Sequence, residues 1–209
     1  MDIEKFDISS IYPELYKADR LKPNLVKVPV VRIMAISGEG DPGGPRFQDS
    51  VAALYSIAYS IKFMPRKGIR PEGYVDFKIA ALEALWSMKN GRVFNTIEKD
   101  QWLWEVFLVV PGFITQKTIK QAIGTIAEQK PNQRYDDIHI ATLQEKKAAQ
   151  IMHIGSYDKE SASLEVLHKY IKKCGYKPAA RHHEIYLSDP NRTPKNKLKT
   201  ILRQPIVKI

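Results

Sequence analysis

The segment 181–188 places a carboxylate between two groups that could assist chemistry. His182, Glu184 and Tyr186 are spaced two residues apart. Side chains of an extended strand alternate between its two faces, so these three are expected to share one face. The apolar set that includes Ile185 is expected on the other face, beneath a helix, so Glu184 is predicted to face a cleft.

A glutamate among aromatic rings loses hydration, which raises its pKa and strengthens its attraction for a cation. Glu184 is therefore predicted to select lipophilic cations or to act as a general base; the alternative is an edge-strand glutamate in water.

Further candidate groups lie on other parts of the chain. Glu83 occupies roughly the corresponding place in the first half, and is predicted either as a second cleft carboxylate or as a strand residue paired with a lysine. Tyr157 lies on a tight turn before a helix, where its hydroxyl could be a general acid or could cap the turn. Aromatic rings offer large contact areas and bind cations through their faces, although such a stripe can equally belong to the core. The predicted ligand-binding side chains are Phe47, Tyr55, Tyr59, Trp86, Trp102, Trp104, His182 and Tyr186.

The elements that must position these residues occur in the same order twice. Apolar residues three and four apart indicate helices, and β-branched apolar runs indicate strands. The first half is predicted as a strand at 28–36, a helix at 48–63 and strands at 74–86 and 102–110, and the second as a strand at 148–154, a helix at 158–173 and strands at 181–188 and 200–208. A helix at 115–129 and a strand at 136–143 are predicted between them, and a short packed helix within 1–24.

Some residues mark the predicted helix ends. Asp49 and Ser50 lie near the start of the first long helix, where such side chains cap free N–H groups. Gly175 lies where a glycine commonly ends a helix.

A strand–helix–strand–strand unit cannot bury both faces of its small sheet alone. Two copies about a pseudo-twofold axis can, and the groove between them is a natural ligand site. The predicted fold class is therefore α+β, a tandem repeat with a ligand cleft between its halves. We expect a single domain over 1–209, with an N-terminal extension at 1–24, a first repeat plus helix at 25–130 and a second repeat at 131–209.

Composition restricts the class of protein. The chain has 209 residues, of which 44% are hydrophobic and 27% charged, as in an ordinary globular protein. No apolar stretch approaches the roughly 20 residues that span a bilayer, and no secretory signal is visible, so no membrane partner is expected. Cys174 is the only cysteine, which suits a reducing cytoplasm, the predicted location.

The net charge of +10 is carried by scattered lysines and arginines. These side chains are predicted to form a solvated surface, and the alternative is that they bind polyanions weakly. A nucleic-acid partner is not favoured, because no helix-turn-helix, zinc-finger or RNA-binding signature accompanies the charge. The oligomeric state is left open between monomer and homodimer.

Three other patterns are set aside. Gly38-x-Gly40-x-x-Gly43 matches a dinucleotide fingerprint, but Glu39 and Asp41 would repel pyrophosphate and Pro42 lacks an N–H donor. It is predicted to be a structural turn. The five histidines are scattered or face opposite ways, so no metal site is predicted, and no cofactor. The lone cysteine is predicted to be inert.

Several separated motifs resemble the GyrI-like small-molecule-binding family. They cover 25–207 in the order the family has them. Ala81-Leu82-Glu83-Ala84-Leu85-Trp86 is similar to the family's Pro-Leu-Glu-Gly-Leu-Trp strand, departing from it at Ala81 and Ala84. The other motifs are Val28-Pro29 leading to Gly38-Glu39-Gly40-Asp41-Pro42, then Phe47 with Leu54-Tyr55 and Tyr59, then Trp102-Leu103-Trp104 to Val110-Pro111, then His153-Ile154-Gly155-Ser156-Tyr157-Asp158, and finally His183-Glu184-Ile185-Tyr186 to Pro190, Pro194, Lys199-Thr200 and Pro205.

The resemblance implies a function for the cleft. Some family members are sensor or sequestering domains of multidrug-responsive regulators, and stand-alone members hydrolyse the cyclopropane ring of DNA-alkylating natural products. The Leu-Glu-x-Leu-Trp and Trp-x-Trp features resemble the stand-alone branch. The leading hypothesis is thus a cofactor-independent hydrolase that binds planar aromatic or lipophilic molecules. In it Glu184 or Glu83 activates water and the hydroxyl of Tyr157 or Tyr186 stabilises developing charge. The alternatives are a non-catalytic protein that binds, senses or sequesters cationic drugs, and an inhibitor of a DNA-processing enzyme.

Overall fold

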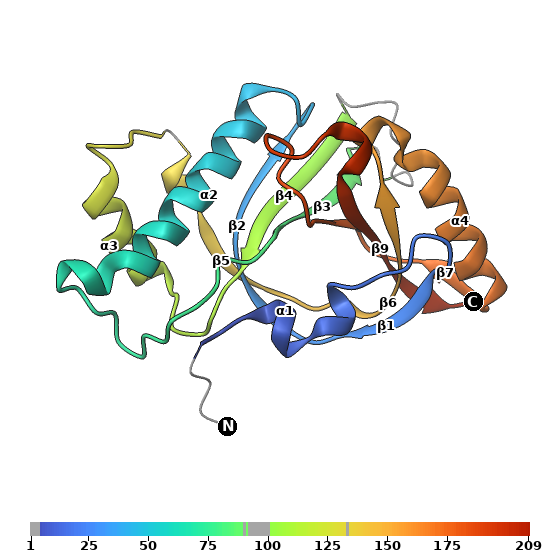
Figure 1. Cartoon of the computed structure of the whole chain (residues 1–209), viewed down its shortest axis with the longest axis horizontal. Helices are drawn as coiled ribbons and strands as arrows, with labels where there is room; N and C mark the ends of the chain where they lie inside the picture. Colours follow the sequence, from blue (N-terminus) through green and yellow to red (C-terminus); the bar gives the residue numbers. More distant parts are fainter. Residues whose placement is uncertain (1–4, 90, 92–100, 133) are drawn as a thin grey trace.

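The computed structural model describes residues 5–89, 91, 101–132 and 134–209 and has a mixed α+β architecture (Figure 1). One curled antiparallel sheet has the strand order β1-β6-β9-β8-β3-β4-β2-β5, with β7 paired to β9. Its strands are β1 (Asn24–Val28), β2 (Val31–Glu39), β3 (Leu82–Met88), β4 (Trp102–Val109), β5 (His139–Leu143), β6 (Lys146–Ile154), β7 (Tyr176–Pro178), β8 (His182–Tyr186) and β9 (Lys199–Lys208). The helices are α1 (Ile8–Ile11), α2 (Pro45–Phe63), α3 (Gln116–Ile126) and α4 (Glu160–Lys173).

The predicted internal repeat is present. The first copy is β2–α2–β3–β4 and the second is β6–α4–β8–β9. The copies meet where β3 pairs with β8 at the centre of the sheet. The strand that precedes each copy joins the other copy, because β1 pairs with β6 and β5 pairs with β2. This exchange of edge strands ties the two halves into one sheet.

The sheet has two covered faces, which we call the helix face and the N-terminal face. On the helix face, α2 packs on residues such as Ile36 and Trp86, and α4 packs on Ile151. On the N-terminal face, the segment that contains α1 packs on residues such as Ile33 and Phe107. Fully buried side chains of this kind each contribute about 1.5–3 kcal/mol of stability through the hydrophobic effect. Because both faces are covered, the central strands β3 and β8 are buried on both sides.

Helix ends follow the predictions only in part. Helix α2 begins at Pro45, with Gly44 at its N-cap and no side-chain cap. Prediction of a cap by Asp49 or Ser50 is therefore wrong, and the Ser50 hydroxyl instead donates to the carbonyl oxygen of Arg46 within the helix. The prediction for Gly175 is confirmed: its φ is 77°, and its N–H donates to the Lys172 carbonyl at the end of α4.

Three predicted strands have different limits. The strand predicted at 136–143 begins at His139, after a short 3-10 helix at Tyr135–Asp137. The strand predicted at 74–86 begins only at Leu82, because Lys62 binds the Asp76 carboxylate and the Phe77 carbonyl and holds the preceding segment beside α2. The strand predicted from Val28 onward is interrupted after Val28, where a proline that cannot donate a ladder hydrogen bond intervenes between β1 and β2.

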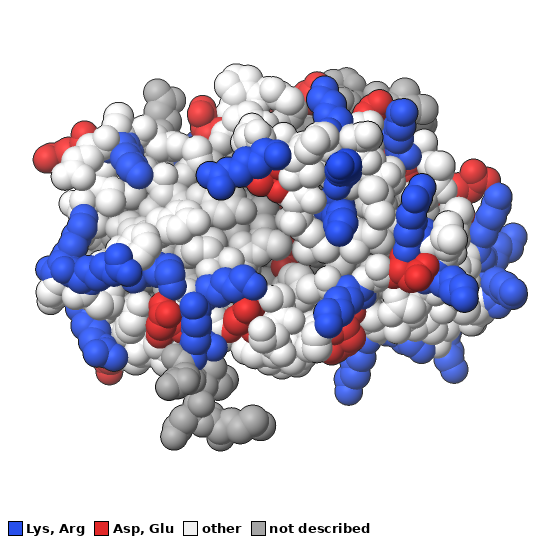
Figure 2. Space-filling model, viewed as in Figure 1, with Lys and Arg blue, Asp and Glu red and all other residues white. Residues whose placement is uncertain are grey.

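Charged side chains cover much of the surface. Figure 2 shows lysines and arginines distributed around the visible face with acidic side chains among them, as the scattered sequence positions predict. Within the described part of the chain, no helix combines the length and apolar character needed to cross a membrane.

Candidate functional site

Strand β8 presents a buried carboxylate on the helix face. Glu184 is only 5% exposed, and its Oε2 accepts a hydrogen bond of 2.6 Å from the Tyr186 hydroxyl. His182 Nε2 lies 3.5 Å from Glu184 Oε1. The three side chains therefore share one face, as strand parity predicts.

The sequence argument assigned the wrong face to the helices. It placed Ile185 and its apolar neighbours beneath a helix, whereas Ile185 packs with Met152 and Ile201 on the N-terminal face. Glu184 lies on the face that carries α2 and α4, opposite Ala84 of β3. Both faces of β8 are buried, so the apolar residues alone could not identify the helix side.

Glu160 is a second carboxyl group of this site, and sequence reasoning missed it. It lies at the start of α4 and is 3% exposed. Burial raises the pKa of Glu160 well above its usual value, and the neighbouring Glu184 charge raises it further, while Thr200 opposes the shift. Two carboxyl groups in one buried site cannot both ionise cheaply, which is the physical cause of this shift.

Two tyrosines lie beside this pair. The rings of Tyr157 and Tyr186 meet edge to face with centroids 5.8 Å apart. Burial raises the pKa of Tyr157 to about 12, with the charges of Glu160 and Glu184 adding to the effect. Burial and the same carboxylates raise the pKa of Tyr186 in the same direction. Both hydroxyls are thus hydrogen-bond donors at neutral pH, and Tyr157, which is 38% exposed, links the site to solvent.

The predicted aromatic residues separate into buried and peripheral groups. The Phe47 ring stacks on Trp86 at 5.8 Å and meets Trp104 edge to face at 5.1 Å, and Trp86 meets Trp102 at 5.2 Å. These four rings are buried parts of the core, beside β8 through the pairing of Trp86 with His182. They form a closed aromatic wall next to Glu184.

The two tyrosines of α2 are less buried. Tyr55 is partly buried against the core, and burial raises its pKa to about 12. Tyr59 is 49% exposed and stacks on Phe63, with centroids 6.2 Å apart. The structure therefore brings Phe47 and the tryptophans together but turns Tyr59 toward solvent.

Glycine at position 38 is required by this wall. Gly38 pairs with Trp104 across β2 and β4, and a Cβ at Gly38 would lie 2.2 Å from an indole carbon of Trp104. Gly40 has a φ of 93° at the end of the strand, a conformation that glycine adopts readily. The fingerprint-like glycines thus serve packing and a turn.

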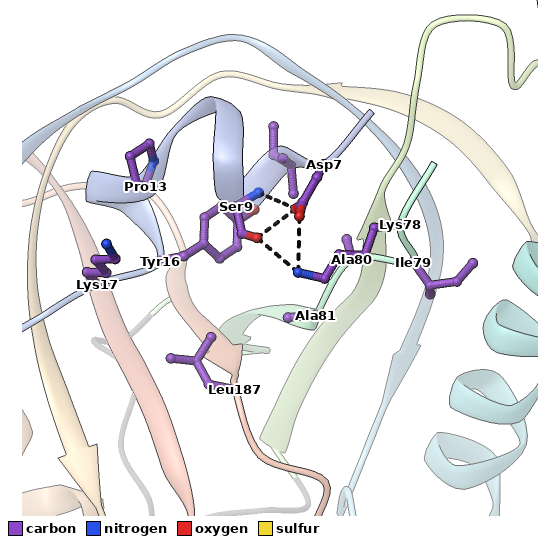
Figure 3. A pocket seen from close by; sticks show the side chains of 11 residues that line it. Asp7, Ser9, Pro13, Tyr16, Lys17, Lys78, Ile79, Ala80, Ala81 and Leu187 are labelled. Carbon is purple, nitrogen blue, oxygen red and sulfur yellow. Dashed lines mark hydrogen bonds and ion pairs between the residues drawn. The ribbon is translucent and has the colours of Figure 1, made fainter. Parts of the chain in front are cut away.

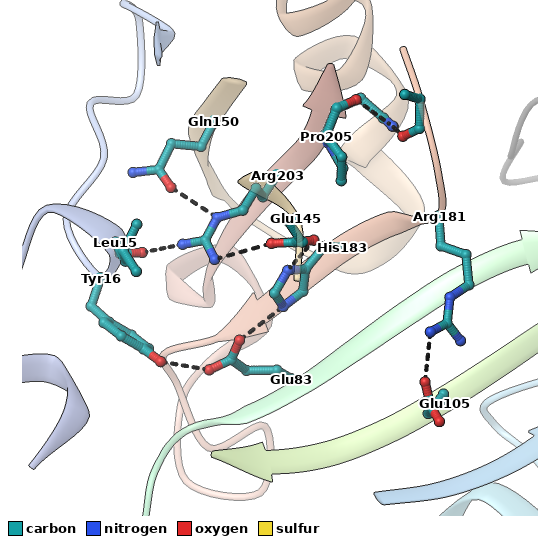
Figure 4. Close-up of polar contacts among 12 residues, drawn as sticks. Leu15, Tyr16, Glu83, Glu105, Glu145, Gln150, Arg181, His183, Arg203 and Pro205 are labelled. Carbon is teal, nitrogen blue, oxygen red and sulfur yellow. Dashed lines mark hydrogen bonds and ion pairs between the residues drawn. The ribbon is translucent and has the colours of Figure 1, made fainter. Parts of the chain in front are cut away.

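Glu83 lies on the opposite face of the sheet (Figure 4). Its Oε1 accepts a 2.7 Å hydrogen bond from the Tyr16 hydroxyl, and its Oε2 lies 2.8 Å from His183 Nε2. The prediction that Glu83 shares one site with Glu184 is therefore wrong, and its partners in the described part of the chain are Tyr16 and His183 and not a lysine. The signal was available: Glu83 is an odd number of positions from Trp86 on one strand, and such residues face opposite ways.

The residues around Glu83 form a charge-balanced network. His183 Nδ1 lies 3.0 Å from Glu145 Oε1, and Arg203 Nη1 lies 3.8 Å from Glu145 Oε2. Burial opposes a charge on His183, but Glu145 and Glu83 outweigh it and raise its pKa. Burial likewise opposes the Glu145 charge, but His183 and Arg203 lower its pKa. Each buried carboxylate here faces a cation.

Among the described residues, no group of three or more His, Cys, Asp and Glu side chains is arranged to hold a metal ion. The chemistry that the Glu184 site itself offers is proton transfer and hydrogen bonding, from a carboxyl pair and two hydroxyl donors beside an aromatic wall.

This arrangement of two strand–helix–strand–strand units in one sheet defines a class of small-molecule-binding folds. Residues 21–207 match the family model for the GyrI-like small molecule binding domain. The chain belongs to this family. No curated protein matches the sequence significantly.

Solved structures with the same fold include proteins described as hydrolases. A hydrolase from Listeria innocua is 30% identical, with a TM-score of 0.84 over 95% of this chain and 98% of its own. A second Listeria innocua hydrolase is 31% identical, with a TM-score of 0.87 over 97% of this chain and all of its own. The C-terminal domain of EcmrR shares the fold at 13% identity and a TM-score of 0.56, over 90% of this chain and 98% of its own.

Proposed function

We propose that the Glu184 site binds planar lipophilic molecules and hydrolyses the cyclopropane ring of those that alkylate DNA. The observation that carries the proposal is a buried carboxylate, Glu184, bonded at 2.6 Å to the Tyr186 hydroxyl beside a wall of tryptophans. Similarity to two Listeria innocua proteins described as hydrolases, at 30% and 31% identity over nearly the whole chain, supports catalysis.

The reaction assigns a role to each group. Glu184 orients a water molecule and takes its proton while the water oxygen bonds to a ring carbon. The carbon–carbon bond of the cyclopropane breaks, and its electron pair moves through the conjugated system to the carbonyl oxygen. The hydroxyl of Tyr157, or that of Tyr186 once its single proton turns from Glu184 to the carbonyl oxygen, stabilises that developing negative charge and supplies the proton that completes the phenol product. The proton held by Glu184 then returns to the tyrosine, so that water is the only co-reactant.

Glu160 supports this assignment. Burial and the Glu184 charge raise the pKa of Glu160, and Glu184 is the member of the pair that accepts the Tyr186 hydrogen bond. Glu83, which lies on the other face, is left out of the mechanism.

The test is incubation of the purified protein with a cyclopropyl-dienone alkylator, followed by mass spectrometry of the water adduct. We expect Glu184→Gln to lower the rate by about 10²–10⁴-fold, the usual contribution of a general base. Glu165→Gln is the matched control, because Glu165 is an exposed glutamate of α4, and it should retain the wild-type rate. Adduct formation at the uncatalysed rate with wild-type protein, or an unchanged rate in Glu184→Gln, would overturn the catalytic proposal.

The second candidate function is binding of lipophilic cations without turnover. It is favoured by the Glu184–Glu160 pair, because a cation could replace the proton that the two carboxyls share. Tetraphenylphosphonium is a suitable probe in a thermal-shift titration. Saturable stabilisation that Glu184→Gln removes, with no turnover of the alkylator, would establish this function instead.

A further inference from the structure

A cavity lies on the N-terminal face (Figure 3), on the other side of the sheet from Glu184. Its volume is about 400 Å³, within the range of small-molecule sites. The segment that contains α1 forms one wall, and residues next to β3 and β8 form the other. The residues that matter for its chemistry are Asp7, Tyr16, Lys17, Lys78, Ala81 and Leu187.

The inner surface of this cavity is apolar and fixed. Ile8, Ile79 and Leu187 line it together with the ring of Tyr16. The Tyr16 hydroxyl is already engaged by Glu83 at 2.7 Å, and burial with the Glu83 charge raises its pKa far above the usual value. Tyr16 is therefore a rigid wall of the cavity and not a source of protons for a reaction. The cavity is suited to binding and not to acid–base catalysis.

The rim of the cavity carries an excess of positive charge. Lys78 Nζ lies 3.1 Å from Asp7 Oδ2 and 3.4 Å from Ser9 Oγ, which balances one ammonium group. The ammonium group of Lys17 forms no ion pair or hydrogen bond within the described residues. In Figure 3 the two lysines lie on opposite sides of the Tyr16 ring. A ligand with an apolar body inside the cavity and a negative group next to Lys17 would match both the apolar lining and the positively charged rim.

We propose that this cavity binds a small amphipathic anion, an apolar ring system that bears a carboxylate or sulfonate group. The cavity is expected to prefer anions, because its rim carries an excess of positive charge. The Glu184 site has the opposite preference, because two carboxyl groups lie together there. The proposal does not depend on the function of Glu184, because the cavity lies on the other face of β3 and β8.

The experiment uses the full chain and the fluorescent anion 8-anilinonaphthalene-1-sulfonate. Wild-type protein should give saturable fluorescence enhancement that weakens with added salt. Lys17→Glu should weaken binding by about fivefold or more, since it turns an attractive rim charge into a repulsive one. Lys172→Glu is the matched control, an exposed lysine of α4 with the same charge change, and should bind within about twofold of wild type. Cooperative urea unfolding with an unchanged midpoint in each variant ensures that the probe does not report unfolded protein.

Location is tested separately by amide chemical shifts. Addition of the probe should move the backbone amide signals of Ala80, Ala81 and Leu187, and the probe should bind Glu184→Gln as tightly as wild type. Lack of saturable binding, equal weakening in Lys17→Glu and Lys172→Glu, or shifts confined to α2 and α4 would each overturn the proposal. Loss of binding in Glu184→Gln would also overturn it, by placing the probe on the helix face.

Discussion

Buried carboxylates have different surroundings on the two faces of the central strands β3 and β8. On the N-terminal face, Glu83 and Glu145 alternate with His183 and Arg203, so that negative and positive groups balance. On the helix face, Glu184 and Glu160 lie together beside His182, whose Nε2 is 3.5 Å from Glu184 Oε1, and the pKa of Glu160 is raised by burial and by the Glu184 charge. The two clusters are back to back, since His183 and Glu184 are neighbours in β8.

The difference separates a structural role from a functional one. A buried ion network with matched charges holds its neighbours in place, and here it anchors the N-terminal segment through the bonds from Tyr16 to Glu83 and from Arg203 to the Leu15 carbonyl. Two carboxyl groups that share one buried site carry a free-energy cost that a ligand or a reaction can relieve. The local balance of charge, and not burial alone, is therefore the reason for proposing the Glu184 cluster, and not the Glu83 cluster, as the ligand site.

The largest expected effect on stability is that of Arg203→Met. Arg203 is 2% exposed and holds Gln150 and the Leu15 carbonyl as well as facing Glu145. Its removal leaves Glu145 with His183 as its remaining partner in the network and takes the donor from the Leu15 carbonyl, and we expect the free energy of unfolding to fall by about 3–5 kcal/mol. Urea denaturation measures it. Arg192→Met is the control, because this arginine is exposed and its ion-pair partner among the described residues is Asp189, and it should cost less than about 0.5 kcal/mol. Similar costs for the two variants would mean that the network does not stabilise the fold.

Much of the fold could be predicted because its signals are local. Helical spacing and β-branched runs identified both copies of the repeat, and the α+β class with pseudo-twofold symmetry is confirmed. Strand β1 was missed because Val28 and the residues after Pro29 read as one strand. The exchange of β1 and β5 between the halves was not predictable, because the choice of a strand partner depends on contacts distant in sequence.

Residues of the site that lie on one strand could be predicted, because strand parity determines which side chains share a face. Residues that tertiary packing brings together could not. Parity placed His182, Glu184 and Tyr186 together, and the same rule applied to β3 would have put Glu83 on the opposite face. Glu160 was missed because a glutamate in the first turn of a helix is ordinarily a solvated residue that interacts with the helix dipole. Only the packing of α4 on β6 and on β9, the neighbour of β8 in the sheet, brings Glu160 to Glu184.

The pH dependence of stability sharpens the comparison on the helix face. The folded-state pKa of Glu160 is raised, so folding takes up a proton above the pKa of the unfolded chain, near 4.5. This contribution to stability is complete below that pH and is lost as the pH rises through the folded-state pKa, at about 1.4 kcal/mol per pH unit. His183, whose pKa is also raised, adds a loss of the same sign.

Glu160→Gln isolates the contribution of the carboxyl pair. Because glutamine does not titrate, the free energy of unfolding of the variant should decline less than that of wild type between about pH 4.5 and 8. The remaining decline should belong to His183 and the other groups that both proteins share. Urea denaturation at several pH values measures the difference. Parallel curves for the two proteins would show that Glu160 titrates as an ordinary glutamate, which would remove the contrast between the faces.

The smallest expected effects come from deleting one hydroxyl on each face. Tyr16 donates to Glu83 at 2.7 Å and Tyr186 donates to Glu184 at 2.6 Å, so the two bonds are chemically alike. Tyr16→Phe should lower the free energy of unfolding by about 1 kcal/mol and leave the rate of ring opening unchanged.

Tyr186→Phe should slow ring opening by tenfold or more, since it removes a donor to the developing charge, unless Tyr157 is the donor that serves the reaction. Tyr157→Phe decides between the two hydroxyls. If Tyr16→Phe slowed the reaction as much as Tyr186→Phe, the two faces would be coupled through β3 and β8, and the balanced network could no longer be regarded as purely structural.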